Sequence, residues 1–315
     1  MRDNDIKVLI SSRSFGKTGS DAIEILKKQG IQPLVNSTGR NLSEDEIINM
    51  AYDAQGIIAG TEKIGEKVIN SIGNLKVISR YGVGLDNVDI ISAKKRDIKV
   101  FNTPGAPTES VAELTVGLIL DLMRKISVVD RNIRHNNWKP EMGVQLNNKT
   151  VGIIGLGQIG KRVVELLSAF NVAFICYEKK PDEEFIKKYE IKLGKLDFLL
   201  KNSDIISIHV PLTNETKNII GKKEIALMKN TSIIVNTARG GLIDEKSLYD
   251  ALKNNKIAGA ALDVFSEEPY NGKLKELDNT ILTAHIGSST VETRKNMDVE
   301  SVNNMIIGLK EAGVL

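Results

Sequence analysis

The 315-residue chain has 43 basic and 40 acidic side chains, a formal net charge of +3, and is 41% hydrophobic and 26% charged. These values are typical of a globular protein with core enough for about two domains. Basic and acidic residues are interspersed, and no apolar run reaches the roughly 18–20 residues of a membrane span. We therefore expect neither nucleic acid nor a membrane among the partners.

The location and redox state of the chain are also constrained by its sequence. The charged N-terminal stretch Met1–Asp5 is not followed by the apolar h-region of a signal peptide, so no signal peptide is expected. Cys176 is the single cysteine, which excludes an internal disulfide and fits a cytoplasmic location. His135, His209 and His285 are far apart in sequence, and no metal site is expected.

Short apolar runs alternate with helical patterns along the first third of the chain. This alternation is typical of a parallel sheet with helices on both faces. A turn signal at Asn102-Thr103-Pro104-Gly105 ends this first unit. Its predicted strands are residues 7–10, 56–58 and 76–78, and its predicted helices are residues 21–29 and 89–96.

A long predicted helix, residues 108–125, leads to a second unit. It is apolar around most of its circumference, which indicates burial in a domain seam or a subunit contact. Six strands with intervening helices then match a complete dinucleotide-binding sheet. A last predicted helix, residues 289–309, follows the final strand of that sheet and could pack against the first unit instead. The six predicted strands are residues 151–154, 172–177, 204–210, 232–236, 258–264 and 280–283.

The motif Gly155-Leu156-Gly157-Gln158-Ile159-Gly160 lies between an apolar strand and an amphipathic helix. In that setting Gly155 permits a tight turn, Gly157 lets the backbone approach a pyrophosphate, and Gly160 allows close packing of helix on strand. Glu178 ends the next strand, where a carboxylate accepts hydrogen bonds from ribose hydroxyls and repels a 2′-phosphate. This favours NAD, although the adjacent Lys179 and Lys180 leave NADP open.

Residues suited to hydride-transfer chemistry follow the later strands of this unit. Arg239 follows one strand and could grip a carboxylate with its guanidinium. Glu267 and Glu268 follow the next, and His285 the one after. A histidine oriented by a carboxylate can act as general acid and base. Each residue alone is more often structural, but their joint position behind a nucleotide-binding motif indicates a site.

The chain resembles the D-isomer-specific 2-hydroxyacid dehydrogenases, in the branch that includes D-3-phosphoglycerate dehydrogenase. The resemblance runs from about Val8 to the C-terminal helix. The motifs that carry it are Tyr81-Gly82-Val83-Gly84-Leu85-Asp86-Asn87-Val88-Asp89, Gly155 to Gly160, His209-Val210-Pro211-Leu212-Thr213, Asn236 to Gly241, Asp263 to Pro269, and His285-Ile286-Gly287-Ser288-Ser289.

The resemblance implies site residues. Arg239, Glu268 and His285 match the family's catalytic triad, with Glu268 chosen because it immediately precedes the proline. Asp263 would contact the nicotinamide carboxamide. The glycine motif, including Gln158 and Ile159, is expected to bind NAD, and so is Glu178. The other expected NAD-binding residues are His209, Val210, Pro211, Thr216, Thr237, Ala238, Asp263 and Gly287. The expected substrate-binding residues are Arg80, Tyr81, Val83 and Gly84, the last two through backbone N–H groups.

The resemblance also implies an architecture. We expect an α/β protein of two doubly wound parallel-sheet domains. A Rossmann NAD-binding domain, residues 102–287, would be inserted into a flavodoxin-like substrate domain, residues 1–101 plus 288–315. Residues from about 108 to 145 would form a homodimer contact. Because this sequence ends at Leu315, serine feedback through a C-terminal regulatory domain is not expected.

The expected activity is interconversion of a D-2-hydroxy acid and its 2-oxo acid. D-3-phosphoglycerate is one candidate. However, Gly60-Thr61-Glu62-Lys63 lacks the arginine-serine pair common in phosphoglycerate dehydrogenases, and Arg80 could either meet a distal phosphate or pair with Asp86. Glyoxylate, hydroxypyruvate or a phosphonate analogue are alternative substrates. An NAD-sensing scaffold with little turnover is the alternative from another class.

Overall fold

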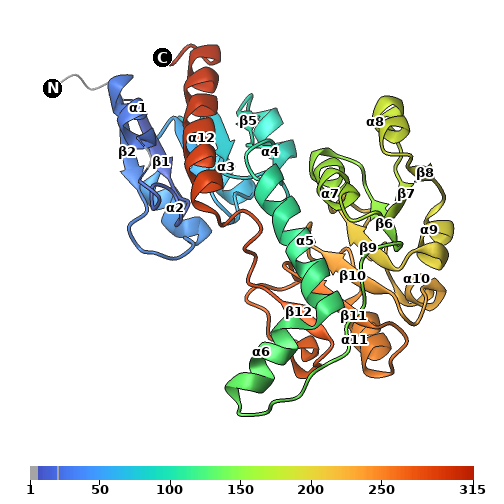
Figure 1. Ribbon diagram of the computed structural model, residues 1–315. Coiled ribbons are helices and arrows are strands. Elements are labelled where there is room, and N and C mark those ends of the chain that lie inside the picture. The colour runs from blue at the N-terminus through green and yellow to red at the C-terminus, as the bar shows by residue number, and fades with distance from the viewer. Residues whose placement is uncertain (1–5, 20) are drawn as a thin grey trace. The chain divides into compact units, whose positions relative to one another are not determined.

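The computed structural model describes residues 6–19 and 21–315. The segment Met1–Asp5, on which the expectation about a signal peptide depends, lies outside the described residues. The chain divides into two compact units, Met1–Pro107 with Ser288–Leu315, and Thr108–Gly287 (Figure 1). Among the described residues, no helix combines the length and apolar character that spanning a membrane requires.

The first unit contains a five-stranded, fully parallel sheet in the order β2-β1-β3-β4-β5. This is the flavodoxin-like order of doubly wound folds. Its elements are β1 (Ile6–Ile10), α1 (Ala22–Lys28), β2 (Ile31–Val35), α2 (Glu44–Met50), β3 (Gly56–Ala59), α3 (Glu66–Ser71), β4 (Val77–Arg80), α4 (Ile90–Lys95), β5 (Lys99–Phe101) and α12 (Val291–Glu311).

The C-terminal helix α12 belongs to this first unit. It packs against β3, β4 and β5 and against α1 (Figure 1). The close approach depends on Gly308, because a Cβ there would lie 2.7 Å from Cγ1 of Val77 and 2.8 Å from the Phe101 ring. The buried residues Met297, Val302 and Met305 of α12 complete the core on this face of the sheet.

The second unit contains a seven-stranded parallel sheet in the order β12-β11-β10-β9-β6-β7-β8. This is the Rossmann order with a further strand, β12, added beyond β11. Its elements are α5 (Thr108–Arg124), α6 (Ile126–Arg134), β6 (Thr150–Ile154), α7 (Gln158–Ser168), β7 (Ala173–Tyr177), α8 (Glu183–Lys188), β8 (Lys192–Leu193), α9 (Leu196–Asn202), β9 (Ile205–Ile208), α10 (Lys222–Leu227), β10 (Ile233–Asn236), α11 (Glu245–Lys253), β11 (Gly259–Leu262), the 3₁₀ helix η1 (Lys273–Glu276) and β12 (Thr280–Leu282).

The expectation of six strands in this sheet was wrong by one. The strand that was not expected, β8, has two residues, both exposed, and pairs with β7 at the edge of the sheet. It has no apolar run, so only its pairing defines it. The central strands β9, β10 and β11 are buried on both faces, as expected for a covered parallel sheet.

Helix α5 covers one face of the second unit. It packs against α7, β10 and β11 and buries Val111, Leu118 and Ile119. On the same side of the core lies Cys176 of β7, which is fully buried, and burial raises the pKa of its thiol to about 12. The thiol is therefore protonated and packed as a small apolar side chain.

Candidate active site

The glycine motif forms the turn between β6 and α7, where a nucleotide cradle is expected. Gly155 has a φ of 94°, and a Cβ there would lie 2.8 Å from the backbone oxygen of His209. A Cβ on Gly160 would lie 2.2 Å from the oxygen of Gly155. A Cβ on Gly157, in contrast, would meet no atom within 4 Å. Gly155 and Gly160 are thus required for packing, whereas Gly157 faces open space at the start of α7, the position in which a dinucleotide pyrophosphate is bound.

Glu178, one residue past β7, is fixed against this turn. Its Oε2 accepts a 2.8 Å hydrogen bond from the N–H of Leu156, and its Oε1 accepts one of 2.9 Å from the N–H of Lys180. Partial burial opposes ionisation, but hydrogen bonds from three backbone N–H groups outweigh it, so the pKa of Glu178 lies below its ordinary value. The residue therefore presents a fixed negative charge beside the glycine turn.

The loop after β9 forms the other wall of the turn. His209 donates its N–H to the oxygen of Ile154 at 2.7 Å, and its ring Nε2 lies 2.8 Å from Oγ of Ser207. Its Nδ1 is inaccessible to solvent and has no hydrogen-bond partner among the described residues. Burial lowers the pKa of His209 to about 4, so the imidazole is neutral at neutral pH. Further along this loop, Thr216 donates from Oγ1 to the oxygen of Pro211 at 2.6 Å.

His285 and Glu268 lie together in the second unit, in the loops that follow β12 and β11. Nδ1 of His285 is 2.8 Å from Oε2 of Glu268, and the two side chains are 40% and 36% exposed. Oε1 of Glu268 accepts a 3.1 Å hydrogen bond from the N–H of Phe265. Burial opposes ionisation of Glu268, but the hydrogen bond and charge of His285, followed by Phe265 and the charge of Arg239, hold its pKa below the ordinary value.

Arg239 follows β10, so the triad residues come from the carboxyl ends of three adjacent strands. Its Nη1 donates to the oxygen of Ala238 at 2.7 Å, and Nδ2 of Asn236 donates to the oxygen of Arg239 at 2.8 Å. Thr237 is buried, with its hydroxyl 2.8 Å from that of Thr115 on α5. The arrangement brings a cation, an imidazole and a carboxylate together at the edge where α/β sheets bind ligands.

Asp263 organises the loop that carries His285, a role that the sequence analysis missed. Its Oδ1 accepts hydrogen bonds from Oγ1 of Thr283 at 2.6 Å and from the N–H of Ile286 at 2.8 Å. Its Oδ2 accepts one of 2.8 Å from the N–H of Gly287, and its backbone oxygen accepts one of 2.9 Å from the N–H of His285. The position of Asp263 directly after an apolar strand was the available signal, but its partners were not readable from spacing.

Of the four expected substrate-binding residues, Arg80 ends β4 in the first unit, and Tyr81, Val83 and Gly84 lie in the loop that follows. The ring of Tyr81 is only 2% exposed and packs in the core, with its hydroxyl donating to the oxygen of Arg294 at 3.2 Å. Nη1 of Arg80 folds back onto the oxygen of Tyr81. Nδ2 of Asn102 donates to the oxygen of Val83 at 2.6 Å and so fixes the loop that Gly84 continues. The N–H of Tyr81 donates to the oxygen of Ala59 at 2.8 Å, so the structure places Tyr81 in the core of the first unit and not on an open binding surface.

Arg294 is a cation near this loop that no motif indicated. It is the fourth residue of α12, and its guanidinium carbon lies 5.8 Å from the ring centre of Tyr81. Its Nη1 donates to Oγ of Ser14 at 3.2 Å and its Nη2 to Oγ of Ser289 at 2.9 Å. Ser14 and Arg294 are distant in sequence, so only the fold brings them together.

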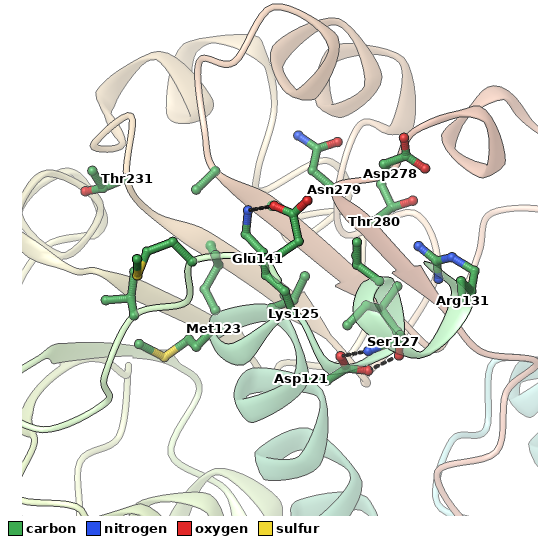
Figure 2. A pocket seen from close by; sticks show the side chains of 18 of the residues that line it. Asp121, Met123, Lys125, Ser127, Arg131, Glu141, Thr231, Asp278, Asn279 and Thr280 are labelled. Carbon is green, nitrogen blue, oxygen red and sulfur yellow. Dashed lines mark hydrogen bonds and ion pairs between the residues drawn. The ribbon is translucent and has the colours of Figure 1, made fainter. Parts of the chain in front are cut away.

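A groove of about 720 Å³ lies elsewhere in the second unit (Figure 2). It is bounded by the ends of α5 and α6, by residues 137–144, and by residues at the amino ends of strands, such as Thr231 and Thr280. The triad lies at the carboxyl ends, so this groove is not the triad site. Several apolar side chains on and beyond α6 are exposed, namely Ile126, Ile133, Trp138, Met142 and Val144.

No group of three or more His, Cys, Asp or Glu side chains arranged to hold a metal ion occurs among residues 6–19 and 21–315. The ionisable residues of the triad site instead form one hydrogen-bonded histidine–carboxylate pair with a neighbouring arginine.

The glycine turn and the acidic residue after β7 are features of dinucleotide-binding Rossmann folds, and the Arg–Glu–His arrangement lies at the carboxyl edge of the same sheet. Residues 116–287 match the model for the D-isomer specific 2-hydroxyacid dehydrogenase, NAD binding domain. The chain belongs to this family, and the matched residues correspond to the family's NAD-binding domain.

The proteins to which this chain is similar are named after several different substrates. The chain is 44% identical over 281 residues to a D-3-phosphoglycerate dehydrogenase of Methanocaldococcus jannaschii, covering 87% of this chain and 53% of that protein. It is 40% identical over 302 residues to a hydroxypyruvate reductase of Thermotoga maritima, covering 92% and 96%. The crystal structure of TT0316 protein from Thermus thermophilus superposes with a TM-score of 0.89 at 32% identity, covering 97% of each chain. This chain spans little more than half the length of the phosphoglycerate dehydrogenases that it matches.

Proposed function

We propose that the protein is an NAD-dependent oxidoreductase that interconverts a short D-2-hydroxy acid and its 2-oxo acid. The observation that carries this proposal is the 2.8 Å bond between His285 and Glu268 beside the charge of Arg239. Gly157, which faces open space at the start of α7, fits an approaching pyrophosphate. When bound, NAD takes up a hydride from C2 of the acid in oxidation and returns it in reduction.

The three residues would divide the work as follows. Because Nδ1 of His285 faces Glu268, Nε2 is the nitrogen that exchanges a proton with the C2 oxygen. The neutral imidazole takes this proton in oxidation, and the imidazolium donates it in reduction. Glu268 fixes the ring and stabilises the imidazolium. Arg239 binds the substrate carboxylate and polarises the carbonyl.

The remaining expected roles are proposals of the same kind. Residues of the first unit would bind substrate, with the N–H groups of Val83 and Gly84 on the carboxylate. The second unit would bind NAD, with Asp263 accepting from the carboxamide. Within the loop, Oδ1 of Asp263 already accepts two hydrogen bonds and Oδ2 accepts one, so Oδ2 can accept a further one.

The substrate class favoured here is a short 2-oxo acid without phosphate, such as hydroxypyruvate or glyoxylate. Glu62 supports this choice, because its carboxylate is buried after β3, accepts a 2.7 Å hydrogen bond from the N–H of Gly60 and is bonded to Ser11. Glutamate offers a phosphate neither a positive charge nor the fork of N–H donors that an arginine would supply. Phosphohydroxypyruvate is the second candidate, and Arg294, whose guanidinium donates to two serine hydroxyls, favours it.

NADH oxidation against a panel of 2-oxo acids tests the function. The panel contains hydroxypyruvate, glyoxylate, pyruvate, 2-oxoglutarate and phosphohydroxypyruvate, and the Arg294→Gln variant is assayed in parallel. Hydroxypyruvate or glyoxylate is expected to react best, with little effect of the variant. Preference for phosphohydroxypyruvate that is lost in Arg294→Gln would establish the second candidate. Intact NADH binding without turnover across the panel would instead support the NAD-sensing scaffold.

We also propose a cytoplasmic homodimer, in which the groove receives a second copy of residues 126–144. The exposed side chains of Trp138 and Met142, 86% and 88% accessible, support this occupant because exposed apolar clusters of this kind mark protein contacts. Sedimentation of the wild type and of a Trp138→Ala/Met142→Ser variant tests it. A dimer that dissociates in the variant is expected, and a monomeric wild type would overturn the proposal.

A further inference from the structure

Two loops flank the glycine turn, one after β7 and one after β9. Strands β7 and β9 are the two hydrogen-bonded neighbours of β6, and all three are parallel. The N–H of Gly155 donates to the oxygen of Tyr177 at 3.0 Å, and the N–H of His209 donates to the oxygen of Ile154, which precedes the turn, at 2.7 Å. In a Rossmann sheet, the adenosine half of the cofactor binds at this end.

An ion pair joins these two loops. Nζ of Lys179, which follows Glu178, is paired with Oε2 of Glu215. The two side chains are 65% and 74% exposed. Glu215 is held in a tight turn, in which the N–H of Thr213 donates to Oγ1 of Thr216 at 2.8 Å. Lys179 is therefore held by a residue of the opposite loop across the adenosine end of the cradle.

Lysines after this strand are the side chains through which such a site could bind the 2′-phosphate of NADP. The sequence leaves that possibility open, because Lys179 and Lys180 directly follow Glu178. In the structure, Lys179 would have to leave Glu215 in order to pair with a 2′-phosphate. The uncompensated carboxylate of Glu215 would then lie near the phosphate, in addition to the fixed charge of Glu178.

We propose that Glu215 is a cofactor-selecting residue, which disfavours NADP(H) by holding Lys179 in an ion pair and by adding negative charge beside the ribose. Glu215 would add to the repulsion of a 2′-phosphate by Glu178. It lies in the loop after β9, whereas Glu178 follows β7. The inference depends on dinucleotide binding and not on which acid is the substrate, so it can be tested without turnover.

The test is titration of the purified full chain with NADH and with NADPH, followed by nucleotide fluorescence at low ionic strength. In Glu215→Gln, the Kd for NADPH is expected to fall by about two- to fivefold, the size of effect typical of an exposed charge pair. The Kd for NADH is expected to change less than about twofold. The gain should shrink in high salt, because exposed charges are screened.

Two further variants make the result decisive. Glu276→Gln removes the same charge from η1, which packs on β12 at the opposite edge of the sheet, and should leave both Kd values unchanged. In the double variant Glu215→Gln/Lys179→Gln the gain for NADPH should disappear. Equal NADPH affinity in Glu215→Gln and Glu276→Gln, or a gain that survives loss of Lys179, would overturn the inference.

These outcomes are distinct from failure of the proposed function. A protein that binds NADH normally but reduces no 2-oxo acid would contradict the proposed reaction and leave the cofactor comparison intact. A wild type that binds neither dinucleotide would overturn both proposals.

Discussion

The carboxylate of Asp263 accepts a 2.8 Å hydrogen bond from the backbone N–H of Gly287, two residues beyond His285. Together with its bonds to Thr283 and Ile286, this contact ties the loop after β12 to the end of β11. His285 itself has a φ of 54°, in the left-handed region that side chains other than glycine seldom adopt. The Asp263 contacts hold the imidazole in this uncommon backbone conformation, within reach of Glu268.

Replacement of Asp263 should therefore destabilise this loop more than replacement of any single residue that donates a hydrogen bond to Asp263. In Asp263→Ala, the N–H groups of Ile286 and Gly287 and the hydroxyl of Thr283 lose their acceptor, and the free energy of unfolding should fall by about 2–4 kcal/mol. Thr283→Val removes a single donor and should cost about 1 kcal/mol. Urea unfolding measures both. Equal losses in the two variants would contradict the central role of Asp263.

The histidine–carboxylate pair predicts separate effects on turnover and on cofactor binding. His285→Ala should lower kcat by about 10²–10⁴-fold, because the proton must then be exchanged without a general acid or base. NADH binding should persist, since His285 is not part of the glycine turn. Glu268→Gln, which keeps the shape but loses the charge that stabilises an imidazolium, should lower kcat as well. Steady-state kinetics and NADH titration test this, and unchanged turnover in His285→Ala would refute the triad assignment.

The glycine turn predicts opposite behaviour for two neighbouring substitutions. In Gly160→Ala the new methyl group would lie 2.2 Å from the oxygen of Gly155, and overpacking of this kind costs about 1–3 kcal/mol of stability. In Gly157→Ala the methyl group meets no protein atom within 4 Å, so stability should change little. NADH affinity should nevertheless fall at least about tenfold, because the methyl group blocks close approach of the pyrophosphate. Thermal unfolding and NADH titration separate the two effects. Normal NADH binding by Gly157→Ala would argue against this location of the pyrophosphate.

The imidazole of His209, whose Nδ1 is inaccessible to solvent, predicts a loss of stability in acid. Its pKa in the folded protein is about 4, below the 6.5 of the free side chain, so the unfolded chain binds the proton more tightly. Stability should therefore decrease as the pH falls from about 6.5 toward 4, by about 2 kcal/mol between pH 7.5 and 5 from this group alone. Urea unfolding of His209→Gln at several pH values should give a flatter dependence.

The exposed histidine His135 provides the matched control for that experiment. His135→Gln removes an imidazole that hydrogen-bonds only the oxygen of Arg131 among the described residues, at 2.8 Å. It should leave the acid dependence of the wild type unchanged. A His209→Gln variant as acid-sensitive as the His135→Gln variant would contradict the assigned cause.

Much of the fold and site could be predicted from the sequence alone. The apolar runs of β6, β9 and β10 are continuous because strands of a covered parallel sheet are buried on both faces, and such runs are readable locally. The glycine motif is also readable from the sequence, because the strand, the turn and the start of the helix that it joins are consecutive along the chain. The family resemblance connected Arg239, Glu268 and His285, and the structure brings His285 and Glu268 into hydrogen-bond contact.

Other features were decided only by the tertiary structure. Strand β8 consists of two exposed residues without an apolar pattern, and it exists because its backbone completes the edge of β7. The partners of Asp263, the pairing of Lys179 with Glu215, and the contact of Arg294 with Ser14 each join segments far apart in the chain. Hydrophobic periodicity records which face of an element is buried, but it contains no information about which loops the crossover connections bring together. Those contacts depend on the order of strands in the sheet, and that order is a property of the whole packed domain.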